Sequence, residues 1–94
     1  MFNIEWEDLL NKNNVNIIDI RDRVKYISSH VYNSRNIELF ELVNYPEKYI
    51  NKEDIYYIYC DNGNKSRYAV YTLNKLGYTT VNINGGFYNY LFRE

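Results

Sequence analysis

Cys60 is the one residue of the sequence that is placed to act as a nucleophile. It follows the apolar run 55–59 and opens a polar loop that leads directly into a helical pattern. Backbone N–H groups at the start of a helix have no intrahelical partner, so they favour a thiolate and bind anions. Gly63 permits the positive φ that such a loop needs, and Lys65 adds a positive charge. The loop residues are Cys60, Asp61, Asn62, Gly63, Asn64, Lys65 and Ser66.

The alternative reading of Cys60 is structural, because a lone cysteine at a strand end is often only a small buried apolar side chain. A chain with one cysteine forms no internal disulfide, which indicates a reducing compartment. The first residues also lack the basic-then-apolar pattern of a signal peptide. We therefore expect a cytoplasmic protein. One Cys, one His and carboxylates are a poor ligand set for zinc, so we expect no metal site.

Length and charge argue against several classes of protein. A chain of 94 residues predicts one domain, 1–94, with no room for a second catalytic domain. The 11 Lys and Arg residues against 12 Asp and Glu give a net charge of −1. This balance argues against nucleic-acid binding, because neutralising phosphates needs a basic surplus. No apolar run approaches the ~20 residues of a membrane span, so we expect no membrane insertion.

The elements that would position Cys60 alternate between short apolar runs and amphipathic segments. The run 55–59 is the strongest strand, and its lack of a polar break predicts burial on both faces, as in a parallel sheet. The segment 65–76 is the clearest helix, with Gly77 as its left-handed stop. Strands are also expected at 2–4, 15–20, 35–37 and 79–83, and helices at 5–13, 21–29, 38–43, 46–50 and 87–93.

This alternation predicts an α/β domain of three layers, in which a mainly parallel sheet of about five short strands carries helices on both faces. Sheets of this kind place ligands at the carboxyl ends of their strands, which is where Cys60 lies. The aromatic residues expected in the core are Trp6, Tyr57, Tyr59 and Phe87.

The loop 60–66 resembles the active-site loop of the rhodanese-like sulfurtransferases, usually written C-x-x-G-x-R-S. It differs only at Lys65, where Arg is usual. Two further segments resemble patterns of the same family, and the three together run from residue 18 to residue 86. One consists of IDIR at 18–21, Tyr26, HV at 30–31 and NI at 36–37, with departures at Ser29, Tyr32, Asn33 and Ser34. The other consists of LGY at 76–78, Val81 and GG at 85–86.

The resemblance implies a rhodanese-like fold and a sulfurtransferase that works by covalent catalysis. Cys60 would take a sulfane sulfur from thiosulfate or a persulfide and pass it, as a Cys60 persulfide, to cyanide or a cellular thiol. Backbone groups of residues 61–66 would hold the persulfide, and Lys65 would replace the anion-binding Arg as a point charge. The implied partners are a small-molecule sulfur donor, a thiol acceptor, or a protein in either role, with no cofactor. We expect a monomer.

Two other functions remain open at this point. A non-catalytic rhodanese-like module would use Cys60 to carry sulfur or an oxidative mark as a signal; Asp61 and the Lys65 substitution favour it. Phosphatases and arsenate reductases on the same fold use C-x5-R, in which the Arg binds the oxyanion. Here position 66 is Ser, and Arg67 comes one residue late. One residue rotates a helix by about 100°, so we expect Arg67 to point away from the loop.

The roles of four other polar residues follow from their neighbours. A carboxylate at Asp61 opposes thiolate formation and repels an anionic donor, unless it points outward and is screened. For Asp19 and Arg21 we favour a structural ion pair over a role in orienting the active loop. His30 matches the family's histidine position, and we expect it to cap a turn rather than act as a base.

Overall fold

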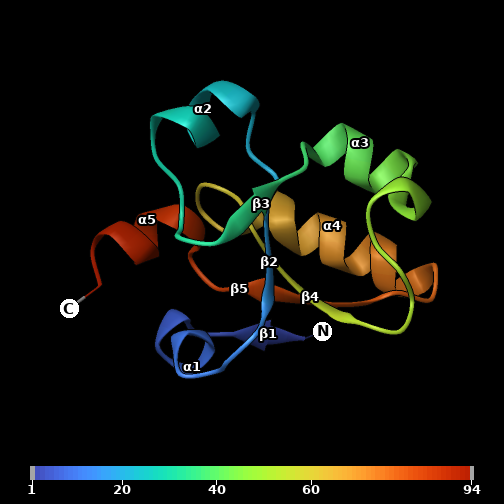
Figure 1. Ribbon diagram of the computed structural model, residues 1–94, viewed down its shortest axis with the longest axis horizontal. Coiled ribbons are helices and arrows are strands. Elements are labelled where there is room, and N and C mark those ends of the chain that lie inside the picture. The colour runs from blue at the N-terminus through green and yellow to red at the C-terminus, as the bar shows by residue number, and fades with distance from the viewer. Residues whose placement is uncertain (1, 94) are drawn as a thin grey trace.

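The computed structural model describes residues 2–93, and its centre is one five-stranded sheet (Figure 1). In spatial order the strands are β1 (Asn3–Ile4), β5 (Thr79–Ile83), β4 (Ile55–Tyr59), β2 (Asn16–Asp19) and β3 (Ser34–Asn36). Every neighbouring pair is parallel. The predicted parallel sheet is therefore confirmed, and the strand that precedes Cys60 lies in its middle.

Helices cover both faces of the sheet, as the three-layer prediction required. One face carries α3 (Leu39–Asn44), a 3₁₀ turn η1 (Pro46–Lys48) and α4 (Asn64–Lys75). The other face carries α1 (Trp6–Leu10) and α5 (Gly86–Leu91). The short α2 (Arg23–Ser28) buries none of its side chains and lies on the opposite side of the view from α1 (Figure 1).

Side chains along β2 and β4 point alternately to the two faces of the sheet, so both cores receive apolar side chains. Ile18 and Ile58 pack in the core beneath α3 and α4, with Cys60 in the same cluster. Ile17 and Tyr59, one residue away, pack in the core beneath α1 and α5. Because side chains in a strand alternate between faces, a continuous apolar run fills both cores at once.

The predicted elements exist, and their boundaries move by a few residues. The helix expected at 5–13 ends at Leu10, and Asn14 then turns the chain with a φ of 57°. The helix expected at 21–29 begins at Arg23, because the side chain of Asp22 accepts a hydrogen bond from Lys25 N and caps the helix. The segment 46–50 forms only a 3₁₀ turn. Of the four aromatic residues expected in the core, Tyr57 is only half-buried, while Trp6, Tyr59 and Phe87 are buried.

A fully buried carboxylate, Asp19, joins the two central strands at their carboxyl ends. It accepts hydrogen bonds from Arg21 Nη2 at 2.8 Å and from the Tyr59 hydroxyl at 2.7 Å. The Tyr59 hydroxyl in turn accepts one from Val31 N at 3.1 Å. Burial and the hydrogen bond to Asp19 raise the pKa of Tyr59. Burial alone would lower the pKa of Arg21, but the hydrogen bonds and charge of Asp19 outweigh it and raise that pKa. The expected structural ion pair is therefore present.

No helix within residues 2–93 is long and apolar enough to cross a membrane. Among the same residues, no three His, Cys, Asp or Glu side chains gather as a metal site would require.

Replacing Asp19 with asparagine tests how far the fold depends on this carboxylate. Asp19→Asn leaves the buried guanidinium of Arg21 without its counter-charge, and losing one partner of a buried pair costs about 3–5 kcal/mol. We expect the free energy of unfolding, measured by urea denaturation, to fall by about 3 kcal/mol or more. The exposed Glu53→Gln is the control, with a change within about 0.5 kcal/mol. A loss below about 1 kcal/mol for Asp19→Asn would contradict this account.

Candidate active site

The sulfur of Cys60 lies at the carboxyl edge of the sheet and receives two backbone hydrogen bonds. Gly63 N donates to Sγ at 3.1 Å and Ser66 N donates at 3.3 Å. Gly63 precedes the first residue of α4 and has a φ of 97°, so the left-handed turn expected at this glycine is confirmed. The residue Cys60 is only 3% exposed. Two N–H groups at the head of a helix therefore surround a sulfur that is largely withdrawn from water, and this arrangement stabilises negative charge on it.

The remaining amides of the loop are not all used in this way. Asn64 N donates to the Asn62 side chain at 3.0 Å, and Asn62 Oδ1 lies 3.9 Å from the sulfur. Gly63 and Ser66 are thus the backbone donors to the thiol. That backbone groups of residues 61–66 hold the persulfide stays a prediction. Asn62 shapes the loop by closing it on the start of α4.

A buried polar chain supports the sulfur from β5. Ser66 Oγ lies 3.4 Å from Sγ and donates its hydrogen to Asn82 Oδ1 at 2.5 Å. Asn82 Nδ2 donates to the side chain of Asn3 at 3.2 Å. The contact between Ser66 and Asn82 was not predicted from the sequence. An asparagine inside a predicted buried strand was a signal, because a buried amide needs hydrogen-bond partners.

The first turn of α5 holds the two residues at the start of the loop. Phe87 N donates to Cys60 O at 2.8 Å, and Tyr88 N donates to Asp61 O at 3.0 Å. The helix approaches so closely that a Cβ on Gly86 would lie 2.4 Å from Cys60 O. The expected turn at residues 85–86 is formed by residues 84–85, and Gly86 is already the first residue of α5.

A cavity of about 220 Å³ opens onto the sulfur and has charges of both signs on its walls. Its cations are Arg21, Lys25 and Lys65, and its carboxylates are Asp22, Glu38 and Asp61. Ile20, Leu39 and Cys60 complete the lining. Arg21 and Lys25 were not assigned to the site from the sequence, yet the strand register accounts for Arg21. Because Asp19 lies opposite Tyr59 in the β2–β4 pairing, Arg21 comes beside Asp61.

Asp61 turns its carboxylate toward these cations. Its Oδ2 lies 2.8 Å from Lys25 Nζ, and its Oδ1 lies 4.0 Å from Arg21 Nη1. The hydrogen bond to Asp61 and the attraction of its charge raise the pKa of Lys25. The Asp61 side chain is 31% exposed, so its charge is both paired and partly screened by water.

Two other candidates lie outside the cavity. Arg67 is exposed and donates to Asn64 Oδ1 at 3.5 Å, and it does not line the cavity, as its late position in the sequence predicted. His30 stacks on the Tyr26 ring, with 3.8 Å between ring centroids, and its Nδ1 lies 2.7 Å from Tyr26 O. The expectation that His30 stabilises a turn rather than acting as a base agrees with this placement.

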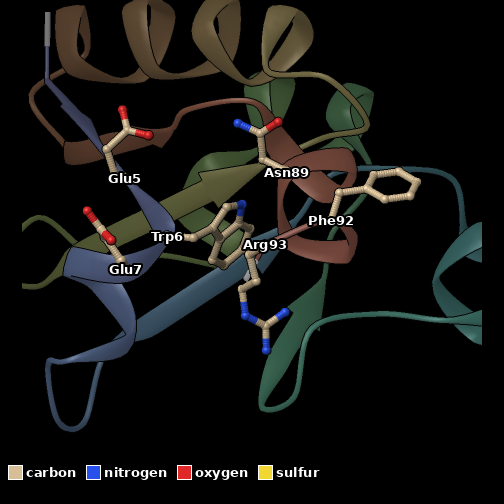
Figure 2. A pocket seen from close by; sticks show the side chains of 6 residues that line it. All are labelled: Glu5, Trp6, Glu7, Asn89, Phe92 and Arg93. Atoms are coloured by element: carbon tan, nitrogen blue, oxygen red, sulfur yellow. The ribbon is translucent and has the colours of Figure 1, made fainter.

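A second, larger cavity of about 280 Å³ lies between α1 and α5 (Figure 2). Its polar groups are largely occupied by local contacts: Trp6 Nε1 donates to Gly86 O at 2.8 Å, and Arg93 donates to Tyr90 O and covers that ring. Figure 2 shows Glu5 and Glu7 on one side and Phe92 on the other. No residue of the Cys60 loop lines this cavity.

The arrangement of Cys60 can be compared with known families. The rhodanese-like domain family matches residues 4–92. The chain belongs to the rhodanese-like domain family. This match covers the whole sheet apart from the first residue of β1, and it includes the Cys60 loop and every residue that lines its cavity.

Relatives of this rhodanese-like domain include both characterised and uncharacterised proteins. It is 35% identical over 72 residues to the uncharacterised protein YqhL of Bacillus subtilis, covering 76% of this chain but only 56% of that protein. It is 32% identical over 83 residues to the thiosulfate sulfurtransferase GlpE of Coxiella burnetii, covering 87% of this chain and 76% of GlpE. The chain thus spans little more than half the length of one relative and three quarters of the other.

The fold also matches solved structures of the family. The rhodanese-related protein of Thermoplasma volcanium superimposes with a TM-score of 0.87 at 29% identity, over 97% of this chain and 91% of that one. The rhodanese-like architecture expected from the sequence is therefore confirmed.

The close approach of α5 to the Cys60 loop can be tested at Gly86. Gly86→Ala would force the backbone of the loop to move, whereas Gly77→Ala at the end of α4 meets only a flexible lysine side chain. Both glycines have positive φ, so each substitution costs about 1–2 kcal/mol in backbone strain. We expect urea denaturation to show that Gly86→Ala loses about 1–3 kcal/mol more than Gly77→Ala. Equal losses would mean that the loop and α5 are not in tight contact.

Proposed function

We propose that this rhodanese-like domain is a sulfurtransferase that works through a persulfide on Cys60. The observation that carries the proposal is the pair of backbone N–H groups, from Gly63 and Ser66, that donate to Sγ inside a cavity lined by three cations. Such a site stabilises the thiolate that must attack and the charged sulfur that must be held afterwards.

The first half-reaction is written here for thiosulfate as the donor. The Cys60 thiolate attacks the outer, sulfane sulfur, a new S–S bond forms, and the S–S bond of thiosulfate breaks. The electron pair of that bond leaves with sulfite, so a thiolate and a thiosulfate dianion give a persulfide anion and a sulfite dianion. Lys65 and Lys25 lie on the wall of the same cavity, where they would attract the anionic end of the donor.

The second half-reaction returns the enzyme to its starting state. A nucleophile such as cyanide attacks the outer sulfur of the persulfide, which breaks the S–S bond and leaves the electron pair on Cys60. Thiocyanate is released, and the thiolate again accepts the two amide hydrogen bonds. A cellular thiol would take the sulfur in the same way and become a persulfide. No metal or organic cofactor enters either step.

The similarity to a thiosulfate sulfurtransferase of Coxiella burnetii supports this reaction class. The small cavity suits a low-molecular-mass donor, although a protein could present its own persulfide there. The lone thiol of this chain favours a reducing, cytoplasmic setting, and we propose that the domain acts as a monomer. Phosphatase chemistry has less support, because Arg67 does not line the Cys60 cavity and Ser66 holds the position of the oxyanion-binding arginine.

The proposal is tested by intact mass measurement after the reduced protein is incubated with thiosulfate. We expect a gain of ~32 Da, one sulfur atom, that is absent from Cys60→Ser and lost again on adding cyanide. Thiocyanate should then accumulate over many turnovers. Ser66→Ala is a matched variant, because it keeps the backbone donor to Sγ and removes the hydroxyl near the sulfur, together with that hydroxyl's hydrogen bond to Asn82.

Two results would contradict the proposal in different ways. If neither thiosulfate nor an organic persulfide adds sulfur to the protein, Cys60 is not a sulfur-accepting nucleophile. If the persulfide forms but cyanide and thiols release no sulfur from it, the domain is a sulfur carrier or sensor rather than an enzyme.

A further inference from the structure

Asp61 is one of the three carboxylates that line the Cys60 cavity, and it pairs with two of the three cations there. Its Oδ2 is hydrogen-bonded to Lys25 Nζ at 2.8 Å, and its Oδ1 lies 4.0 Å from Arg21 Nη1. Both cations line the cavity together with Cys60. Since Asp61 lines the same small cavity as Cys60, an anionic donor that enters this cavity comes near the carboxylate.

Arg21 is held in a fixed position by other parts of the fold. Its Nε and Nη2 donate to Asp19, and Nη2 also donates to Ser29 O at 2.6 Å. Its guanidinium carbon lies 4.0 Å from the centre of the Phe87 ring. Within residues 2–93, Nη1 makes no hydrogen bond and faces Asp61. The guanidinium is therefore a fixed cation whose free end is opposed by Asp61.

Lys25 differs because it can move. Its side chain is 51% exposed and extends from α2, which buries no side chain. Such a lysine can leave Asp61 and pair with a bound anion. This change of partner adds little binding free energy, because the Asp61 carboxylate stays beside the donor and repels it. The pairing therefore makes the cavity less attractive to negative charge than its three cations suggest.

We propose that Asp61 is an internal anion that sets the charge class of the sulfur donor, disfavouring dianions and favouring donors that carry one negative charge or none. The inference rests on the proposed sulfurtransferase function and adds the substrate class. Organic thiosulfonates and persulfides belong to the favoured class, and thiosulfate to the disfavoured one.

The repulsion has a simple dependence on the charge of the donor. The Coulomb energy between Asp61 and a bound donor is proportional to that charge, so a dianion is repelled about twice as strongly as a monoanion. If removing Asp61 raises kcat/KM for a monoanion by a given factor, it should raise kcat/KM for a dianion of similar shape by about the square of that factor. Any general effect of Asp61 on the Cys60 thiolate changes both values by the same factor and cancels in their ratio.

Thiosulfate and methanethiosulfonate form a matched pair of probes, because both transfer a sulfane sulfur and they differ by one negative charge. With methanethiosulfonate, the Cys60 thiolate takes the outer sulfur and methanesulfinate leaves with the electron pair of the broken S–S bond. In a two-step transfer to cyanide, kcat/KM for the donor reports only the first half-reaction. We would measure it for both donors with wild-type protein, Asp61→Asn, Lys25→Met and Glu53→Gln.

We expect Asp61→Asn to raise the thiosulfate-to-methanethiosulfonate ratio of kcat/KM by about threefold to tenfold, and more at low salt than at high salt. Lys25→Met should lower the ratio, since it removes a cation and leaves Asp61 in place. The exposed Glu53, which precedes β4 at the opposite end of the sheet from Cys60, is the matched control, and its loss should leave the ratio unchanged.

An unchanged ratio in Asp61→Asn would overturn the charge-selection role while leaving the proposed function intact. If Asp61→Asn does not fold, the test rests on Lys25→Met. A thiosulfate-to-methanethiosulfonate ratio for that variant equal to the wild-type value then overturns the charge-selection role. Failure of the proposed function itself has a different signature, because neither donor would then add sulfur to the wild-type protein, and the inference would fall with it.

Discussion

The structure depends first on the buried carboxylate of Asp19. A buried charge needs several partners, and Asp19 finds them in Arg21, two residues beyond the end of β2, and in the Tyr59 hydroxyl on β4. Tyr59 is the residue before Cys60, and the Arg21 guanidinium lies against Phe87 in the helix that holds the Cys60 carbonyl. One buried charge therefore fixes the strand end, the helix and the cation beside the Cys60 loop.

The chemistry of Cys60 follows from its position on this framework. A thiol at the end of a buried strand would be inert in an apolar pocket, but here the following helix begins with N–H groups aimed at the sulfur. Asp61 acts against that effect, and the fold compensates by pairing it with Lys25 and placing it near Arg21. The site is thus a balance between donors that favour negative charge and a carboxylate that opposes it.

Much of this could be predicted from the sequence because it is local. The apolar run 55–59, the polar loop and the helical pattern after it predicted the position of Cys60 at the end of a buried strand, and Gly63 indicated the turn. Contacts between distant segments could not be predicted in the same way. Lys25 reaches Asp61 across 36 residues, and Ser66 meets Asn82 across 16. Such contacts depend on strand order and register, which periodicity does not specify. Helix ends shifted because single residues such as Asp22 and Asn14 decide them.

We propose that the Gly63 and Ser66 amides hold the charged sulfur before and after transfer. The ¹⁵N–¹H spectrum of labelled protein would be recorded before sulfur donation, after it, and after cyanide is added. The amide signals of these two residues should shift on persulfide formation and return with cyanide, while that of Gly77 stays in place. A persulfide confirmed by mass that leaves both signals unmoved would mean that these amides do not hold the transferred sulfur.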